Sequence, residues 1–156
     1  MGNWTIGHVG ICVADLARSL SFWCDGLGFE RLRGFAFKSP SWRQVMEIDG
    51  PLDLHTQIIR RDGMTLELLH FLSPPADGDG ARHPMTRLGF THLALWVDDL
   101  DAMAARLVAH GGTIVDGTDT HFDHPRLRGR WLMCTDPDGI RLELIQCEGG
   151  GAIVEP

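Results

Sequence analysis

The stretch that decides the fold is HVGICVADL at residues 8–16, because it recurs as HLALWVDDL at residues 92–100. Another stretch also occurs twice, as DGMTLEL at residues 62–68 and as DGIRLEL at residues 138–144. The first repeat is offset by 84 residues and the second by 76, so the two copies differ in length by eight residues between these stretches. The chain is therefore a duplicated unit.

Each copy is expected to fold as a strand, a helix and then three strands. Apolar residues alternate in the opening strand of both copies and then recur at helical spacing. Asp15 is the expected N-cap of the first helix, and Asp98 or Asp99 that of the second. The later strand candidates are residues 30–37, 44–48, 54–60 and 64–71 in the first copy, which is one more than three, and residues 113–116, 130–135 and 140–147 in the second. We predict an α+β fold in which two paired βαβββ modules form an eight-stranded, cup-shaped sheet.

The organisation that follows is one domain over residues 1–156. Module 1 covers about residues 4–72 and module 2 about residues 89–148, and the turn-rich segment 73–88 links them. The composition is 44% hydrophobic, which is enough to bury a core without disulfides.

The net charge of −7 argues against nucleic acid or an anionic membrane as partner. The chain shows no membrane-spanning apolar run and no basic-then-apolar leader. We therefore expect a cytoplasmic protein with a small-molecule partner.

The four cysteines show no metal-binding or redox spacing. Each aligns with an apolar residue of the other copy; Cys134, for instance, aligns with Ile58. We expect reduced cysteines that fill core or pocket positions.

Two histidines and two glutamates occupy equivalent positions in the copies. His8 matches His92, and Glu67 matches Glu143. One such residue alone is more often structural or solvated. Two matching pairs in a duplication instead predict a shared site for one divalent cation, because imidazole and carboxylate suit such an ion and two carboxylates neutralise its charge.

Residues that share the strand faces of these ligands would line the pocket. The two copies place their large side chains at different positions, since Trp96 of the second copy aligns with Cys12 of the first and Phe71 of the first aligns with Cys147 of the second. These side chains predict a substrate with an apolar portion, although ordinary core filling is the alternative. Arg141 shares the face of Glu143, where it would bind a substrate carboxylate or form a surface salt bridge. His121 and His124 are expected on a loop that either closes over the site or is solvated.

The motifs resemble the vicinal oxygen chelate superfamily, which includes glyoxalase I, methylmalonyl-CoA epimerase, extradiol dioxygenases and antibiotic-resistance proteins. The resemblance runs from HVGI at residues 8–11 through FWCDGLGF at residues 22–29 to DPDGIRLEL at residues 136–144. It implies a metal held on the first and last strands of two βαβββ modules, by the residues that match His8, Glu67, His92 and Glu143.

Two departures from the family pattern bear on the reaction. Cys12 stands where bacterial glyoxalase I usually has an arginine that contacts glutathione, which puts that substrate in doubt. Extradiol dioxygenases use a second-shell tyrosine and lack a counterpart of Glu67, whereas this chain has no tyrosine and retains that glutamate. Drug-binding members of the fold generally lack the metal ligands.

The resemblance and the four ligands together predict a metal-dependent lyase or isomerase. A divalent ion (Ni, Co, Zn, Mn or Fe) would stabilise the enediolate of a small α-hydroxy or α-oxo carbonyl substrate, while Glu143 or Glu67 shuttles the proton. The alternatives are an iron(II)-dependent extradiol-type dioxygenase of catechol-like substrates and a non-catalytic antibiotic- or ligand-binding protein. The family commonly dimerises, so we expect a homodimer, with each site inside one chain or shared between two.

Overall fold

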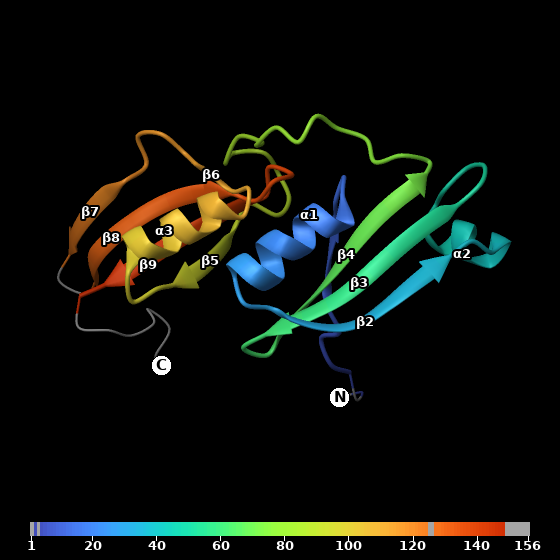
Figure 1. The fold of residues 1–156 in the computed structure, drawn as a ribbon, viewed down its shortest axis with the longest axis horizontal. Helices are drawn as coiled ribbons and strands as arrows, with labels where there is room; N and C mark the ends of the chain where they lie inside the picture. Colours follow the sequence, from blue (N-terminus) through green and yellow to red (C-terminus); the bar gives the residue numbers. More distant parts are fainter. Residues whose placement is uncertain (1, 3, 125–126, 149–156) are drawn as a thin grey trace. The chain divides into compact units, whose positions relative to one another are not determined.

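The computed structural model describes residues 2, 4–124 and 127–148, and these fall into two compact units, residues 1–79 and 80–156. Each unit contains one mixed sheet with a helix packed on it (Figure 1). The boundary between the units falls inside the predicted linker, residues 73–88. That both units form one domain stays a prediction.

The first unit is a four-stranded sheet in the order β1-β4-β3-β2. β1 runs parallel to β4, and the other neighbours are antiparallel. Its elements are β1 (Val9–Cys12), α1 (Leu16–Leu20), the π-helical segment η1 (Ser21–Gly26), β2 (Glu30–Phe37), α2 (Pro40–Val45), β3 (Asp53–Arg61) and β4 (Met64–Ser73).

Local chemistry accounts for the ends of these elements. Asp15 caps α1, since its carboxylate accepts a hydrogen bond of 2.8 Å from the Arg18 amide, as predicted. The β3–β4 hairpin turns at Asp62 and Gly63, whose φ angles of 47° and 79° are those of a tight hairpin turn.

The core of the first unit lies between its sheet and the α1–η1 helix. Ile59, Leu66 and Leu68 point from the sheet to this side and are buried. Trp23 of η1 is fully buried and packs edge-on against Phe22 and Phe29, with ring centroids 5.7 and 5.5 Å away. The opposite face of the sheet is therefore available for a site.

The second unit repeats this plan with the strand order β5-β9-β8-β6. Asp99, one of the two predicted caps, accepts the Ala102 amide at 2.9 Å and begins its helix. The elements are β5 (Leu93–Trp96), α3 (Leu100–Ala109), β6 (Thr113–Ile114), β7 (Thr120–His124), β8 (Leu127–Thr135) and β9 (Arg141–Cys147). Leu100, Leu107, Leu142 and Leu144 form the core between α3 and the sheet.

The α+β prediction is confirmed, but the described residues contain nine strands rather than eight. β6 and β7 pair with opposite ends of β8, so the edge position that one strand was expected to fill is occupied by two short strands. His121 and His124 were expected on a loop and lie on β7 instead. The prediction failed because all five side chains of β7 are exposed and carry no apolar alternation.

Two further expectations are wrong. Residues 44–48 are not a strand, because Ser39-Pro40 begins the short helix α2 there. Cys134 is not the counterpart of Ile58. Cys134 pairs with Leu142 on the helix side of its sheet, whereas Ile58 pairs with Glu67 on the opposite side. The β8–β9 turn is longer than the β3–β4 turn, so aligning the two copies without a gap puts Cys134 one residue out of register with Ile58. A shift of one residue places a side chain on the other face of a strand.

The four cysteines are not paired with one another, and Cys134 is fully buried. Burial raises the pKa of its thiol to about 12. None of the helices among the described residues has the length and apolar character needed to span a membrane.

Candidate metal centre

In the first unit, the structure brings together His8 and Glu67. Their Nε2 and Oε2 atoms lie 3.0 Å apart, and the glutamate side chain is only 13% exposed. Glu67 pairs in register with Gly10 of β1, and His8 stands two residues before Gly10 in the chain. Strand alternation therefore directs both side chains to the face of the sheet opposite α1.

The second unit places His92 and Glu143 in the same way. Their Nε2 and Oε2 atoms lie 3.4 Å apart, and both side chains are largely buried. Glu143 pairs with Ala94 of β5, two residues after His92. The same strand register thus produces the same imidazole–carboxylate pair in both units.

The distances within these pairs fit a metal ion. Two ligand atoms at about 2.1 Å from one ion, separated by an angle of about 90–110°, lie about 3.0–3.4 Å apart. The measured separations of 3.0 and 3.4 Å match this spacing. In the described part of the chain such side chains meet only in pairs, and no group of three or more is placed to hold an ion. A site that uses both pairs is therefore a proposal.

A second layer of contacts orients His92. Its Nδ1 lies 3.0 Å from the hydroxyl of Thr91, which leaves Nε2 directed at Glu143. Such a partner on the other ring nitrogen is typical of metal-binding histidines. Arg141 donates to the carbonyl oxygens of Thr91 (3.3 Å) and His83 (2.7 Å).

Among the described residues, Arg141 therefore has carbonyl partners instead of the surface salt bridge expected as one alternative. Its side chain is buried, and desolvation, reinforced by the charge of Arg82, lowers its pKa. Its guanidinium fastens the chain just before His92. A role in binding substrate, predicted from the sequence, stays a prediction.

The other predicted pocket residues lie on the faces of the two pairs. Cys12 follows Gly10 by two residues and is exposed, and Phe71 follows Glu67 by four and is half-buried. Trp96 follows Ala94 by two and is 38% exposed. By contrast, His70 and Gln146 lie on the helix side: His70 Nδ1 is 3.3 Å from the Val13 carbonyl, and Gln146 accepts the Leu100 amide at 3.0 Å.

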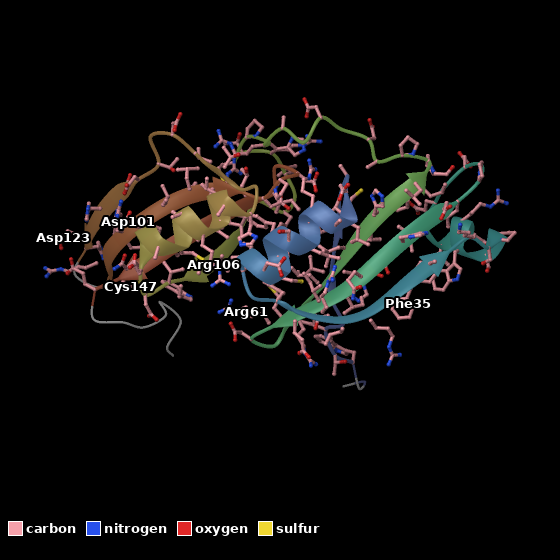
Figure 2. The ribbon with its side chains drawn as sticks, viewed as in Figure 1. Phe35, Arg61, Asp101, Arg106, Asp123 and Cys147 are labelled. Carbon is pink, nitrogen blue, oxygen red and sulfur yellow. The ribbon has the colours of Figure 1, made fainter. Side chains whose placement is uncertain are left out.

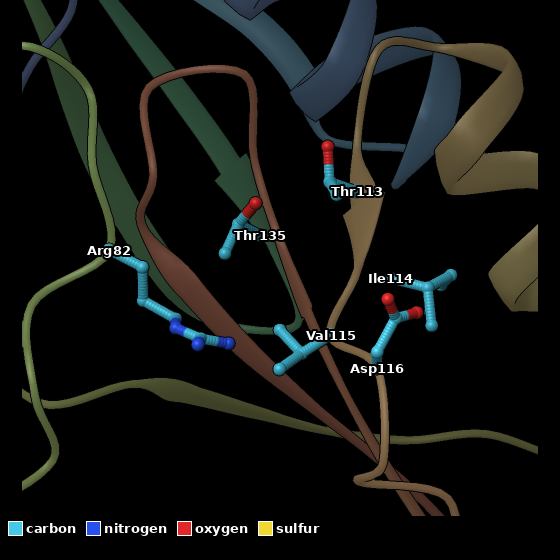
Figure 3. Close-up of a pocket in the computed structure, with 6 residues that line it drawn as sticks. All are labelled: Arg82, Thr113, Ile114, Val115, Asp116 and Thr135. Atoms are coloured by element: carbon cyan, nitrogen blue, oxygen red, sulfur yellow. The ribbon is translucent and has the colours of Figure 1, made fainter.

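Each unit also has an open pocket. One, of about 570 Å³, is lined by Leu32, Arg33, Phe35 and Ile58 of the first unit. The other, of about 500 Å³, lies in the second unit around β6 and the end of β8 (Figure 3). Its lining is Arg82, Thr113, Ile114, Val115, Asp116 and Thr135. Sequence reasoning identified neither lining, since both depend on strand pairing across a sheet edge.

Comparison with known proteins shows the family to which the chain belongs. The family model of the glyoxalase/bleomycin resistance protein/dioxygenase superfamily matches residues 5–144. The uncharacterized protein YaeR of Escherichia coli is 32% identical, over 94% of this chain and 98% of that protein. A 2-epi-5-epi-valiolone epimerase of an Actinomyces species is 28% identical, over 96% of this chain and 82% of the enzyme. A glyoxalase family protein from Bacillus cereus superimposes with a TM-score of 0.78 at 22% identity, covering 96% of this chain and 97% of that one.

Proposed function

Because the chain belongs to the glyoxalase/bleomycin resistance protein/dioxygenase superfamily, we propose that it is a metal-dependent lyase or isomerase acting on a small α-hydroxy or α-oxo carbonyl compound. The observation that carries this proposal is the imidazole–carboxylate pair that each unit forms at the same strand register. The similarity to an epimerase supports proton transfer as the type of reaction.

His8, Glu67, His92 and Glu143 would hold the cation, which would be Ni, Co, Zn, Mn or Fe. When bound, such an ion acts as a Lewis acid that makes a C–H bond beside a carbonyl more acidic. The donor set fits this role, because two neutral imidazoles and two carboxylates balance a charge of +2 in a partly buried place. Both pairs would serve one ion, within one chain or across a homodimer.

The chain's own contribution to the chemistry is the movement of a proton. One carboxylate, of Glu67 or Glu143, takes the proton from the carbon next to the carbonyl. The same carboxylate then delivers the proton to the neighbouring carbon, while the hydroxyl proton passes to the former carbonyl oxygen. For inversion at the first carbon, the other glutamate would instead deliver a proton to the opposite face. One proton leaves and one is added, so the substrate is isomerised without net oxidation. His8 and His92, whose Nε2 atoms lie 3.0 and 3.4 Å from these carboxylates, would act beside them as ligands of the cation.

The test is metal analysis of the purified protein together with Glu67→Gln and Glu143→Gln. Glu30→Gln is the matched control, since Glu30 is exposed and its only ion pair among the described residues is with Arg60, 3.8 Å away. We expect about one divalent ion per site in the wild type, a loss of metal in both ligand variants and full retention in the control. Solvent deuterium should also enter α-hydroxy ketones at the carbon next to the carbonyl.

Two other outcomes would replace the proposal. Oxygen-sensitive iron, with oxygen consumed in the presence of catechols and insensitive to Glu67→Gln, would establish the dioxygenase. Protein without stoichiometric metal, even after incubation with each ion, would indicate a ligand-binding protein. Light scattering of the metal-loaded protein tests the proposed homodimer.

A further inference from the structure

The pocket of about 570 Å³ in the first unit is lined by a residue that pairs directly with Glu67. Ile58 of β3 lines the pocket and is the direct cross-strand partner of Glu67 on β4. Side chains of directly paired residues lie on the same face of a sheet, within about 4.5–5.5 Å at Cβ. A molecule that contacts Ile58 in the pocket is therefore one strand away from the proposed metal ligand, on the same face of the sheet.

A β-bulge shapes this pocket. In the pairing of β2 with β3, Arg31 faces Ile59 and Gly34 faces Gln57, so Leu32 and Arg33 together stand opposite the single residue Ile58. A bulge of this kind redirects side chains and is common beside active sites. Here it places an apolar and a cationic side chain in one pocket.

The pocket has an apolar floor. Leu32 and Phe35 are 40% and 41% exposed although both are large and apolar, and Ile58 is half-buried between them and β4. Phe35 projects from β2 (Figure 2), and its ring stacks on Phe37 at 5.9 Å. Phe37 in turn contacts Trp42 of α2 at 4.4 Å, so the apolar surface continues beyond the pocket.

Arg33 supplies a free positive charge at this floor. Within the described residues its guanidinium has no ion pair or hydrogen bond, and it is exposed. The arginines of the adjacent strand differ, because Arg60 contacts Glu30 and Arg61 contacts Asp62. In a chain with a net charge of −7, an unpaired arginine beside an apolar floor is suited to an anionic ligand.

We propose that the substrate carries an apolar, ring-sized group that lies on Leu32, Phe35 and Ile58, and a carboxylate that pairs with Arg33. This inference rests on the proposed function for the reaction at Glu67, but the binding of the two groups does not require it. A single guanidinium matches a monoanionic carboxylate, which it binds through two parallel hydrogen bonds. The volume of the pocket is within the range of small-molecule sites, about 300–1,000 Å³.

The experiment measures binding of 3-phenylpropanoate to the full-length protein by calorimetry, in the presence of a chelator. This probe has the ring and the carboxylate but no carbonyl next to a carbon acid, so neither metal nor catalysis is needed. Its neutral amide, 3-phenylpropanamide, removes the charge, and propanoate removes the ring. The variants are Arg33→Met and Phe35→Ala. Arg31→Met is the matched control, because Arg31 pairs with Ile59 and so points to the opposite face.

We expect Arg33→Met to weaken the binding of 3-phenylpropanoate about tenfold and to leave the amide unaffected. Phe35→Ala should weaken both ring-bearing probes, whereas Arg31→Met should change nothing. Equal affinity of the wild type and Arg33→Met for 3-phenylpropanoate would overturn the inference, and so would equal affinity of the wild type for acid and amide. Because the chelator removes any metal, failure of the proposed reaction leaves this result unchanged, and failure here leaves the metal analysis unchanged.

Discussion

Replacing Arg141 with methionine should destabilise the protein and displace His92. Arg141 donates one short hydrogen bond, 2.7 Å, to the His83 carbonyl and one long one, 3.3 Å, to the Thr91 carbonyl. The segment between them, residues 83–91, is exposed throughout. The guanidinium is therefore its principal buried attachment, and methionine keeps the apolar stem while removing the donors.

The magnitude follows from these two contacts. A hydrogen bond from a charged donor contributes about 1.5–3 kcal/mol, and the longer bond contributes little. We expect the free energy of unfolding to fall by about 1.5–3 kcal/mol, measured by urea denaturation followed by tryptophan fluorescence. Arg31→Met is the control, because Arg31 is exposed and makes no hydrogen bond or ion pair within the described residues, and its effect should stay within about 0.5 kcal/mol.

Metal affinity is the second measurement on the same variant. Loss of the contacts that orient a metal-binding histidine typically weakens affinity by about 10–100-fold, and we expect a loss in this range. If stability falls while metal affinity is unchanged, Arg141 fastens the segment but His92 is not a ligand. An Arg141→Met protein with the stability and metal affinity of the wild type would refute the reasoning altogether.

Three further outcomes are expected. Arg130 lowers the pKa of Asp119 by donating hydrogen bonds of 2.8 and 2.6 Å to its carboxylate. This ion pair therefore stabilises the fold above the ordinary carboxyl pKa of about 3.8, and the stabilisation is lost as the pH falls through the lowered pKa. Urea denaturation should show that Asp119→Asn reduces the free energy of unfolding at pH 6 and reduces it less at pH 3. Thr56→Val should raise the free energy of unfolding by about 1 kcal/mol, because the buried Thr56 hydroxyl has no hydrogen-bond partner among the described residues. Thermal melts measure the change. A loss of stability would mean that the hydroxyl is hydrogen-bonded. Burial raises the pKa of the Cys134 thiol to about 12, so Cys134 should resist iodoacetamide at pH 8 while the exposed Cys12 is alkylated. Mass analysis of the peptides measures the extent of alkylation at each cysteine.

Much of the fold was predictable because its local signals are strong. The strands that carry Glu67 and Glu143 show the two-residue alternation that their buried leucines impose. Asp15 and Asp99 cap their helices as expected, since a carboxylate before an apolar periodic run satisfies free backbone amides. Each imidazole–carboxylate pair follows from the strand register alone.

What could not be predicted depends on contacts that leave no periodicity. β7 is an edge strand with exposed side chains, so hydrogen bonds to β8 alone define it. The bulge at Leu32 and Arg33 is a mismatch between two strands, which neither strand shows by itself. The contacts of Arg141 with carbonyl groups are equally hidden, because any residue offers a carbonyl.

The duplication constrains how the proposed centre works. Each unit supplies one imidazole and one carboxylate, and a cation of this kind requires at least four ligands, or three with an open position for substrate. One pair alone falls short of that number and leaves most of the ion's charge unbalanced. Under the proposal, tight metal binding therefore requires both units, and a variant that loses either pair should lose the ion as completely as a variant that loses both. Equal loss of metal in the single-pair and double-pair variants distinguishes a shared centre from two independent weak sites. With independent sites, removing one pair would abolish only the metal bound by that pair.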